Sequence, residues 1–254
     1  MSAPPVLLTY QQKWISDTSP VKVYEKSRRI GISWAEAADD ALYAASESGD
    51  DVWYIGYNQD MAREYIEDAA FWSRNYQLAA EEMEEDVLAD EGIDGKDIQV
   101  YRIKFASGNK VTALSSRPAN LRGKQGRVVI DEAAFHPDLA GLIKAALALL
   151  MWGGSVRIIS THDGEDNHFN EIIQDILAGK LPYSLHRITI DDALDQGLYE
   201  RICLRLGKTP SPEGKAAWRA ELFKMYGDDA DEELLCIASQ GGGAYLSRAL
   251  IESR

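Results

Sequence analysis

Short apolar runs alternate with longer amphipathic stretches up to about residue 180 of the chain. Apolar runs of four to eight residues are typical of strands covered on both faces, whereas apolar positions three or four residues apart indicate helices. The pattern predicts strands at 21–26, 51–57, 98–105, 110–116, 126–135 and 155–164, and helices at 33–48, 60–78 and 138–154. Residues 98–116 are expected to form a hairpin or two adjacent strands. This order of elements predicts an α/β fold with a mainly parallel sheet flanked by helices.

The pattern changes beyond about Leu181, where short helices and polar loops replace the alternation. We therefore expect a core at residues 1–180 and a smaller helical appendage at residues 181–254. Three strands of the core end in polar residues, at 26–33, 131–132 and 160–164. Ligands bind where the strands of such sheets end, so these three segments are expected to meet at one site.

The composition is that of a globular protein, since 254 residues with 45% hydrophobic side chains can bury a sizeable core. No apolar run approaches the roughly 20 residues that a membrane span needs, and the N-terminus does not resemble a signal peptide. The two cysteines, Cys203 and Cys236, stand outside any metal-binding or disulfide pattern. These features predict a soluble intracellular protein without a zinc site.

The net charge of −14 is unevenly distributed along the chain. Residues 81–97 hold nine acidic side chains and one lysine, and we expect them to form a solvated helix or loop. Residues 98–130 hold seven basic side chains and no acidic one. The total charge disfavours attraction of nucleic acid over the whole surface, so the basic stretch is the better candidate for contact with phosphates.

The segment "KSRRIGIS" at 26–33 joins a predicted strand to a predicted helix, where an NTPase holds its phosphate-binding loop. In the pattern G-x-x-x-x-G-K-[ST], Gly31 takes the place of the second glycine and Ser33 that of the Mg²⁺-binding hydroxyl. Ile32 stands where the lysine is expected. The loop nevertheless holds three cations, one of which can replace that lysine: Lys26, Arg28 and Arg29.

Two other strand ends carry residues suited to nucleotide chemistry. In "VVIDEAAF" (128–135), Asp131 is expected to hold Mg²⁺ through water, and Glu132 to polarise the water that attacks the γ-phosphate. In "IISTHDG" (158–164), the polar exit with Thr161 and His162 is placed to sense the γ-phosphate and to signal to a neighbouring segment.

In their order and spacing, these motifs resemble the ATPase domain of the large terminases of tailed phages, the DNA-packaging motors, and especially its Mu-like branch. "LLTYQQKWISD" (7–17) is similar to the adenine-side motif of that family, with Tyr10, Gln11 and Trp14. "SRRIGIS" (27–33) is similar to the terminase form of Walker A, in which an arginine, here Arg28, follows the first small residue. "VVIDEAAF" matches Walker B with the catalytic glutamate, and "STHDG" matches the coupling motif. The resemblance covers nearly the whole chain and implies a P-loop NTPase fold of the RecA/ASCE type.

The resemblance also implies a Mg²⁺-dependent ATPase and a role for each motif residue. Ser33 and Asp131 would bind the metal, and Glu132 would be catalytic together with Arg28. An arginine from a neighbouring subunit can complete the site, and Arg122 in "NLRGKQG" (120–126) is the candidate. For the missing Walker A lysine, Lys26 is the first expectation and Arg28 the second. The implied ATP-contacting residues are Tyr10, Gln11, Lys26, Ser27, Arg28, Arg29, Gly31, Ser33, Thr161 and His162.

A member of this family would drive double-stranded DNA into a procapsid in the host cytoplasm, away from any membrane. Its partners would be the portal protein, the small terminase subunit and further copies of itself in a ring. Large terminases also carry a C-terminal RNase H-like nuclease, for which no room remains after Arg254. Residues 181–254 are therefore expected to be an ATPase subdomain and a linker toward that domain, and nuclease activity is not expected in this chain.

Two alternatives use the same motifs differently. The chain is a helicase-like or DNA-repair ATPase if a second RecA-like domain, rather than a nuclease, follows it in the native gene. It is a nucleotide-binding scaffold module if the loss of the Walker A lysine ended hydrolysis.

Overall fold

The computed structural model describes residues 6–76, 84–88 and 98–240. Eight strands within them form one sheet in the order β3-β4-β5-β2-β6-β7-β1-β8. The strands are β1 (Val21–Lys26), β2 (Val52–Ile55), β3 (Glu84–Leu88), β4 (Ile98–Lys104), β5 (Lys110–Leu114), β6 (Arg127–Asp131), β7 (Ser155–Ser160) and β8 (Ser184–Ile188). All neighbours from β5 to β8 pair in parallel, whereas β4 pairs antiparallel with both β5 and β3. The predicted α/β class with a mainly parallel sheet is confirmed, as are the adjacent strands within 98–116.

The acidic stretch at 81–97 was expected to be a helix or loop, and this expectation is wrong for Glu84–Leu88. These residues form the edge strand β3, in which Glu84 is the register partner of Arg102 and Leu88 that of Ile98. Charged residues are common on edge strands, because they discourage pairing with another chain. The rest of the acidic stretch lies outside the described residues.

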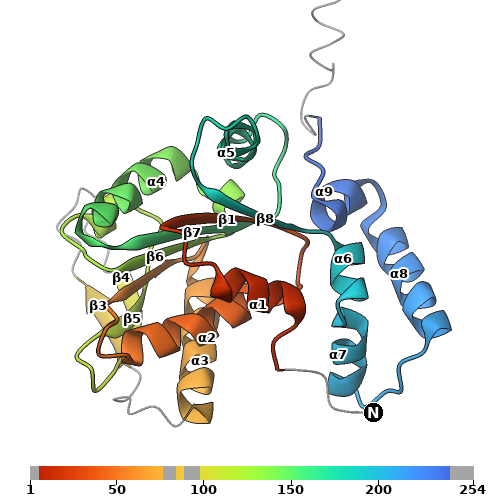
Figure 1. The fold of residues 1–254 in the computed structure, drawn as a ribbon, viewed down its shortest axis with the longest axis horizontal. Helices are drawn as coiled ribbons and strands as arrows, with labels where there is room; N and C mark the ends of the chain where they lie inside the picture. Colours follow the sequence, from red (N-terminus) through yellow and green to blue (C-terminus); the bar gives the residue numbers. More distant parts are fainter. Residues whose placement is uncertain (1–5, 77–83, 89–97, 241–254) are drawn as a thin grey trace, which may run out of the picture.

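Helices cover both faces of the sheet (Figure 1). On one face lie α1 (Thr9–Ser16), α2 (Ile32–Ala45) and α3 (Gln59–Asn75), and on the other α4 (Leu139–Leu147) and α5 (His168–Leu177). Successive residues of a strand point to opposite faces. Tyr24 and Val129 accordingly pack in the core beside α1 to α3, whereas Val23 and Ile130 pack in the core beside α4 and α5. With both faces covered, every residue of β1, β2 and β6 is buried.

The observed helices are close to the predicted ones, with one difference at the end of α4. A single helix was expected over 138–154, but after Leu147 the chain tightens into a 3₁₀ segment, Ala148–Trp152. Gly153, with φ +84°, then ends the helical path, as glycine does at many helix C-termini. The start of α3 is fixed by Asn58, whose side chain accepts a hydrogen bond from the backbone N–H of Met61.

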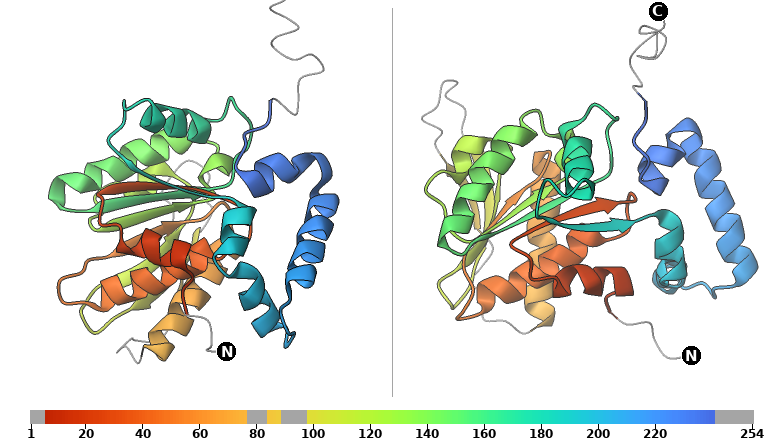
Figure 2. Two further views of the ribbon diagram at one scale, coloured as in Figure 1. Left: turned by 45° about the vertical axis from the view of Figure 1, so that its right-hand side comes forward. Right: turned by 45° about the horizontal axis from the view of Figure 1, so that its top comes forward.

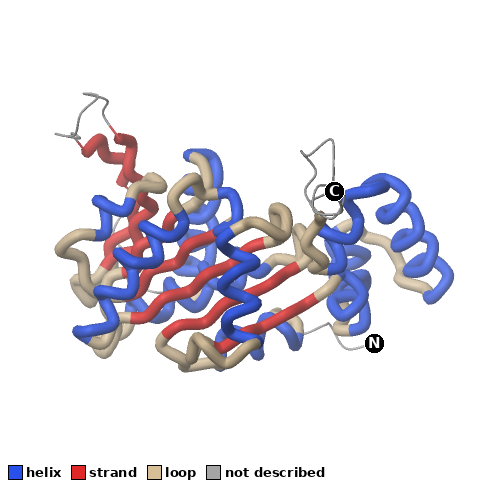
Figure 3. Tube along the Cα trace, turned by 90° about the horizontal axis from the view of Figure 1, so that it is seen from above, coloured by secondary structure: helices blue, strands red, loops and turns tan. Residues whose placement is uncertain are grey.

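The sheet extends past residue 181, since β8 pairs with β1. A group of helices follows at that edge of the sheet (Figures 2 and 3). This group, here called the C-terminal helices, comprises α6 (Ile190–Asp195), α7 (Leu198–Arg205), α8 (Pro212–Tyr226) and α9 (Ala230–Leu235). The predicted division at residues 180/181 stays a prediction, and most of the expected linker, 241–254, lies outside the described residues. No helix in the described part of the chain has the length and hydropathy required to cross a bilayer.

Candidate active site

The segment 27–31 forms a loop between β1 and α2, as the sequence predicts. Gly31 precedes α2 with φ +78°, a conformation that favours glycine, and a Cβ atom there would lie 3.1 Å from Nε2 of Gln11. Arg29 also has a positive φ, +58°. Ile32, at the position of the usual lysine, is buried in the core with 1% of its surface exposed. Ile32 therefore packs the start of α2 into the apolar core and supplies no charge to the loop.

The residues of the predicted adenine-side motif lie behind this loop. The Tyr10 hydroxyl donates a hydrogen bond to the carbonyl of Ile30 at 2.6 Å, and Nε2 of Gln11 donates to the carbonyl of Gly31 at 2.7 Å. Both side chains are buried. A cavity beside the loop is lined by Lys26, Asp131 and Glu132, among others. In the described part of the chain, neither Tyr10 nor Gln11 lines this cavity. The structure thus shows them holding the loop backbone, and direct contact with a nucleotide stays a prediction.

The three loop cations have different partners. Nζ of Lys26, at the end of β1, lies 3.0 Å from Oε1 of Glu132. Nη1 of Arg28 lies 2.5 Å from Oε1 of Glu233 in α9. Arg29 is exposed and forms no ion pair with any described residue. All three line the same cavity, and Lys26 is the one already in contact with the predicted catalytic carboxylate.

Ser27 is the polar loop residue that is buried. It is fully buried, its backbone N–H donates to the carbonyl of Ile188 at 2.8 Å, and its hydroxyl lies 3.5 Å from the carbonyl of Glu233. It does not line the cavity within the described residues. Ser27 was predicted to contact ATP. In this structure, however, both of its donors, the backbone N–H and the hydroxyl, are directed toward protein carbonyls.

Asp131 ends β6 next to the loop and is surrounded by hydroxyl groups. The Tyr54 hydroxyl donates to Oδ2 of Asp131 at 2.9 Å, and the Ser33 hydroxyl lies close enough to this carboxylate to lower its pKa. Burial and the neighbouring charge of Glu132 raise the pKa of Asp131, while Lys26 and the two hydroxyls oppose this shift. Sequence reasoning paired Ser33 with Asp131 but missed Tyr54, because only the pairing of β2 with β6 brings Tyr54 there.

Glu132 follows β6 in a left-handed backbone conformation, φ +49° and ψ +49°. Such conformations are costly for residues other than glycine and cluster at functional sites. Oε1 of Glu132 contacts Lys26, whereas Oε2 is buried and has no hydrogen-bond partner among the described residues. A buried acceptor without a partner is suited to a water molecule or another donor from a ligand.

One cavity of about 590 Å³ joins the loop, the acid pair and the C-terminal helices. Sequence reasoning missed several of its lining residues, since they come from other elements: Tyr54, Glu64, Tyr65, Asp68 and Arg205. Arg205, at the end of α7, adds a fourth cation to the three of the loop. Burial raises the pKa of Asp68 to about 6, with smaller contributions from the charges of Glu64 and Glu67.

The two residues that follow β7 line different cavities. Thr161 lines the cavity described above. His162 lines a second one, of about 570 Å³, where its Nε2 lies 2.8 Å from Oε1 of Glu25. Adjacent residues of an extended chain point to opposite sides, so the structure brings Thr161, but not His162, to the loop and the acid pair. This differs from the expectation that both sense the γ-phosphate.

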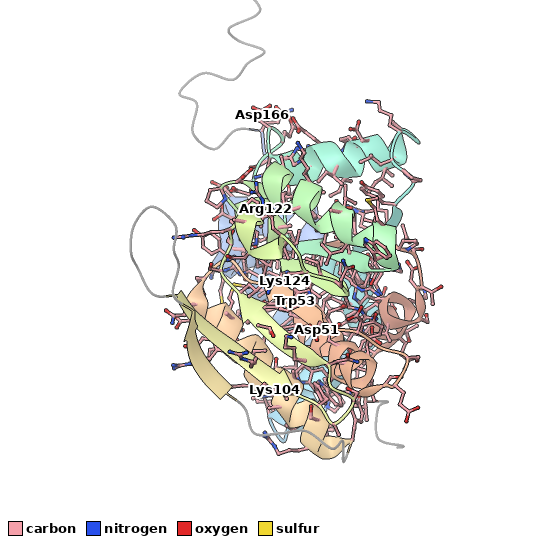
Figure 4. All side chains as sticks on the ribbon, turned by 90° about the vertical axis from the view of Figure 1, so that its left-hand side faces the viewer. Asp51, Trp53, Lys104, Arg122, Lys124 and Asp166 are labelled. Atoms are coloured by element: carbon pink, nitrogen blue, oxygen red, sulfur yellow. The ribbon has the colours of Figure 1, made fainter. Side chains whose placement is uncertain are left out.

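Arg122, the predicted trans-acting arginine, is exposed and does not line the described cavity of its own chain. Figure 4 shows it with Lys124 and Trp53 on one side of the molecule. Nζ of Lys124 lies 4.5 Å from the Trp53 ring centroid, a cation–π contact. The basic stretch 98–130 is not wholly available for phosphates, because Arg127 is buried and forms ion pairs within the protein.

A network of buried charges lies between α2 and the strands β6 and β7. Nη1 of Arg127 is 2.7 Å from both Oδ2 of Asp39 and Oδ1 of Asp40, and Arg157 lies 3.4 Å from Glu36. Glu36, Asp39 and Asp40 place carboxylate oxygens within 4.8 Å of one another, a spacing that can hold a metal. Two arginine charges already offset most of the charge of these three carboxylates, and their ion pairs join α2 to β6 and β7.

Three residues that line the cavity fit Mg²⁺ better than Glu36, Asp39 and Asp40 do. Ser33, Asp131 and Glu132 offer only oxygen donors, which are the ligands that Mg²⁺ prefers. The Ser33 hydroxyl near the Asp131 carboxylate, together with the unpartnered Oε2 of Glu132, forms a set of oxygen ligands that a hard cation can bind.

Comparison with known proteins gives a consistent result. A family profile described as "Terminase large subunit, T4likevirus-type, N-terminal" matches residues 23–253. The chain is 53% identical over 252 residues to Mu-like prophage FluMu protein gp28 of Haemophilus influenzae (strain ATCC 51907 / DSM 11121 / KW20 / Rd), covering 97% of this chain and 49% of that protein. It is 51% identical over 256 residues to the probable terminase, large subunit gp28, of Escherichia phage Mu, covering 98% of this chain and 46% of that protein. The chain thus spans about half the length of these relatives.

The fold agrees with this assignment. The ATPase domain of a Thermus phage large terminase superposes with a TM-score of 0.61 at 18% identity, covering 92% of this chain and 94% of that one. A large terminase from a thermophilic bacteriophage, solved in complex with ADP, superposes with a TM-score of 0.62 at 15% identity, covering 91% of this chain and 53% of that one. At these identities the likeness shows the fold alone, which is the predicted P-loop fold. With a family profile over most of its length and two relatives at about half identity, the chain belongs to the terminase large subunit family.

Proposed function

We propose that this chain is the ATP-hydrolysing motor domain of a phage large terminase, which powers the translocation of double-stranded DNA into a procapsid. The observation that carries the proposal is the contact of Lys26 with Glu132 across a cavity that also holds Asp131 and Ser33. The proximity of a loop cation, two oxygen ligands suited to Mg²⁺ and a carboxylate suited to water activation supports this proposal. The ADP bound to the large terminase of the thermophilic bacteriophage supports a nucleotide as the ligand.

The parts of this site would act by position and charge. The start of α2 and the loop before it would receive the phosphate chain, since a helix N-terminus favours anions. Ser33 and Asp131 would hold Mg²⁺, which neutralises phosphate charge when bound. Glu132 would accept a hydrogen bond from the attacking water and orient it. Lys26 would stabilise the negative charge that develops on the phosphate oxygens.

The test is the Glu132→Gln variant, which keeps the size of the side chain and removes its charge. We expect ATP binding to persist and turnover to fall by about 10²-fold or more, measured as phosphate release. Glu171→Gln is the matched control, because Glu171 lies exposed on α5 and does not line the cavity in the described structure. Normal turnover by the Glu132 variant would remove the proposal.

Arg122 would serve the site of a neighbouring copy in a homo-oligomeric ring. Mixing tests this role. Arg122→Ala chains keep their own Glu132, and Glu132→Gln chains keep their own Arg122, so mixed assemblies should regain turnover that neither variant shows alone. If mixtures are as inactive as their components, Arg122 does not act in trans.

DNA and the other partners are part of the same proposal. Double-stranded DNA, the portal protein and the small terminase subunit would raise turnover in the assembled motor. DNA movement without strand separation distinguishes this function from that of a helicase-like or repair ATPase. Binding of ATP without turnover, even with DNA and partner subunits present, would indicate the scaffold alternative.

A further inference from the structure

Helix α9 contacts the phosphate-binding loop through Glu233. The Glu233 carboxylate holds the Arg28 guanidinium at 2.5 Å, and the Glu233 carbonyl accepts the backbone N–H of Arg28 at 2.8 Å. The side chain and the backbone of Arg28 are therefore both bound to one residue that lies 205 positions away. Both groups of Arg28 are donors that a loop of this kind offers to phosphates.

The preceding residue, Glu232, contacts the segment after β7. Its Oε1 accepts the backbone N–H of Gly164 at 2.6 Å and that of Ser239 at 3.1 Å. The Ser239 carbonyl in turn accepts the N–H of Glu165 at 2.9 Å. Two consecutive carboxylates thus join α9 to the Walker A loop and to the coupling motif.

The end of α9 is also attached to the sheet. Nη2 of Arg187, in β8, donates to the carbonyls of Leu235 and Cys236 at 2.9 Å and 3.2 Å. Cys236 is buried, and its thiol donates to the carbonyl of Ile188 at 3.3 Å. A displacement of α9 from the loop would therefore expose the Cys236 thiol.

The contact between Arg28 and Glu233 is open to competition. Arg28 is about half exposed and lines the cavity in which the phosphates would bind. Phosphate oxygens are strong acceptors for a guanidinium, so a bound triphosphate would attract the same group. Burial raises the pKa of Glu233, whereas the charges of Arg28 and Lys26 lower it. When Arg28 turns to a phosphate, the attachment of α9 to the loop is weakened.

On the basis of the proposed function, we propose that Glu233 is a positioning residue that holds Arg28 and α9 together, and that the phosphates of ATP compete with it for Arg28. Binding of ATP thereby breaks the ion pair and favours the release of α9 from the loop, and loss of phosphate restores the contact. The C-terminal helices then sense the state of the site through one arginine.

The first test compares ATP affinities in the 254-residue chain, with a fluorescent ATP analogue and Mg²⁺ as the probe. Glu233→Gln should tighten binding, by up to about fivefold, because Arg28 no longer has a competing anion. The gain should vanish when Arg28→Ala is added. Glu232→Gln is the matched control, since it removes the same charge from the same helix without freeing Arg28. Equal tightening by both glutamine variants would reduce the effect to net charge and overturn the proposal.

The second test follows α9 itself through thiol labelling. Cys203→Ser leaves Cys236 as the single thiol of the chain. The ATP analogue should speed the labelling of Cys236 severalfold, and Glu233→Gln should speed it without nucleotide. A merely structural role for Glu233 predicts no response to nucleotide. If the chain binds the analogue and labelling stays unchanged in both cases, the release of α9 is wrong while the ATPase proposal stands. If the chain binds no ATP, both proposals fail.

Discussion

The Lys26 ammonium group and the Glu132 carboxylate are 106 residues apart in the sequence and 3.0 Å apart in the structure. Lys26 ends β1 and Glu132 follows β6, with β7 lying between these two strands in the sheet. The contact lies where the phosphates would bind, so the loop cation that is the first candidate to replace the Walker A lysine lies beside the group that would activate water.

From this contact we expect Lys26→Met to reduce ATP turnover by about 10²-fold and to weaken ATP binding, because the site loses the cation nearest its acid pair. Phosphate release and binding of a fluorescent ATP analogue measure the two effects. Lys180→Met is the control, since Lys180 pairs with Asp175 on the surface. If Arg29→Ala abolishes turnover and Lys26→Met does not, Arg29 holds this role.

Tyr54→Phe removes one hydroxyl and leaves the ring, which stacks on Tyr65 at a centroid distance of 3.7 Å. Asp131 then loses a donor in a fully buried position, and hydrogen bonds to charged groups contribute about 1.5–3 kcal/mol. We expect a loss of that size in the free energy of unfolding, measured by urea denaturation. Tyr57→Phe serves as the control, because Tyr57 is half exposed. Equal stability of the two variants would mean that the Tyr54 hydroxyl contributes little.

Arg127→Met leaves Asp39 and Asp40 without their shared cation in the interior. Breaking a buried ion pair by removing one partner costs about 3–5 kcal/mol, whereas an exposed pair contributes about 0–1 kcal/mol. Urea denaturation of Arg127→Met and of Lys180→Met compares these two cases directly. If Arg127→Met lowers the free energy of unfolding as little as Lys180→Met does, the network is not essential to stability.

The sequence allowed a good prediction of those parts of the site that follow from local pattern and from parallel-sheet geometry. The loop at 27–31 and the acid pair after β6 belong to this class, because strand exits meet at one edge of such a sheet. Tyr54 and Glu233 do not, since one depends on the order of strands and the other on the packing of a distant helix. The edge strand β3 was missed for a similar reason: its pairing with β4 is not visible in the polarity of its own residues.

ATP binding should also depend on pH through Asp68. Burial raises the pKa of this carboxyl to about 6, so the folded state binds its proton more tightly than the unfolded chain does. Its contribution to stability is therefore complete below the ordinary pKa of about 4 and is lost as the pH rises through about 6. Over the same range, Asp68 places a negative charge in the cavity that weakens ATP binding.

The comparison of wild type with Asp68→Asn isolates this effect, because ATP itself also gains a proton in this range. The two affinities should agree near pH 5, and the variant should bind up to about fivefold more tightly at pH 7.5. Glu171→Gln is the control, as Glu171 is exposed on α5, does not line the described cavity and does not contribute to the pKa shift of Asp68. A constant ratio of affinities across the pH range would contradict the role of Asp68.

The left-handed backbone at Glu132 lowers the stability of the fold, whereas the Glu132 side chain would be required for ATP hydrolysis. A side chain there costs the native state about 1 kcal/mol that glycine would not cost. Glu132→Gly should therefore melt at a higher temperature than the wild type while losing all turnover. A gene released from selection for ATP hydrolysis would be expected to drift toward glycine or asparagine at this position. The amino acid found here in a newly sequenced relative is thus a simple first indication of whether that relative keeps the proposed ATPase activity.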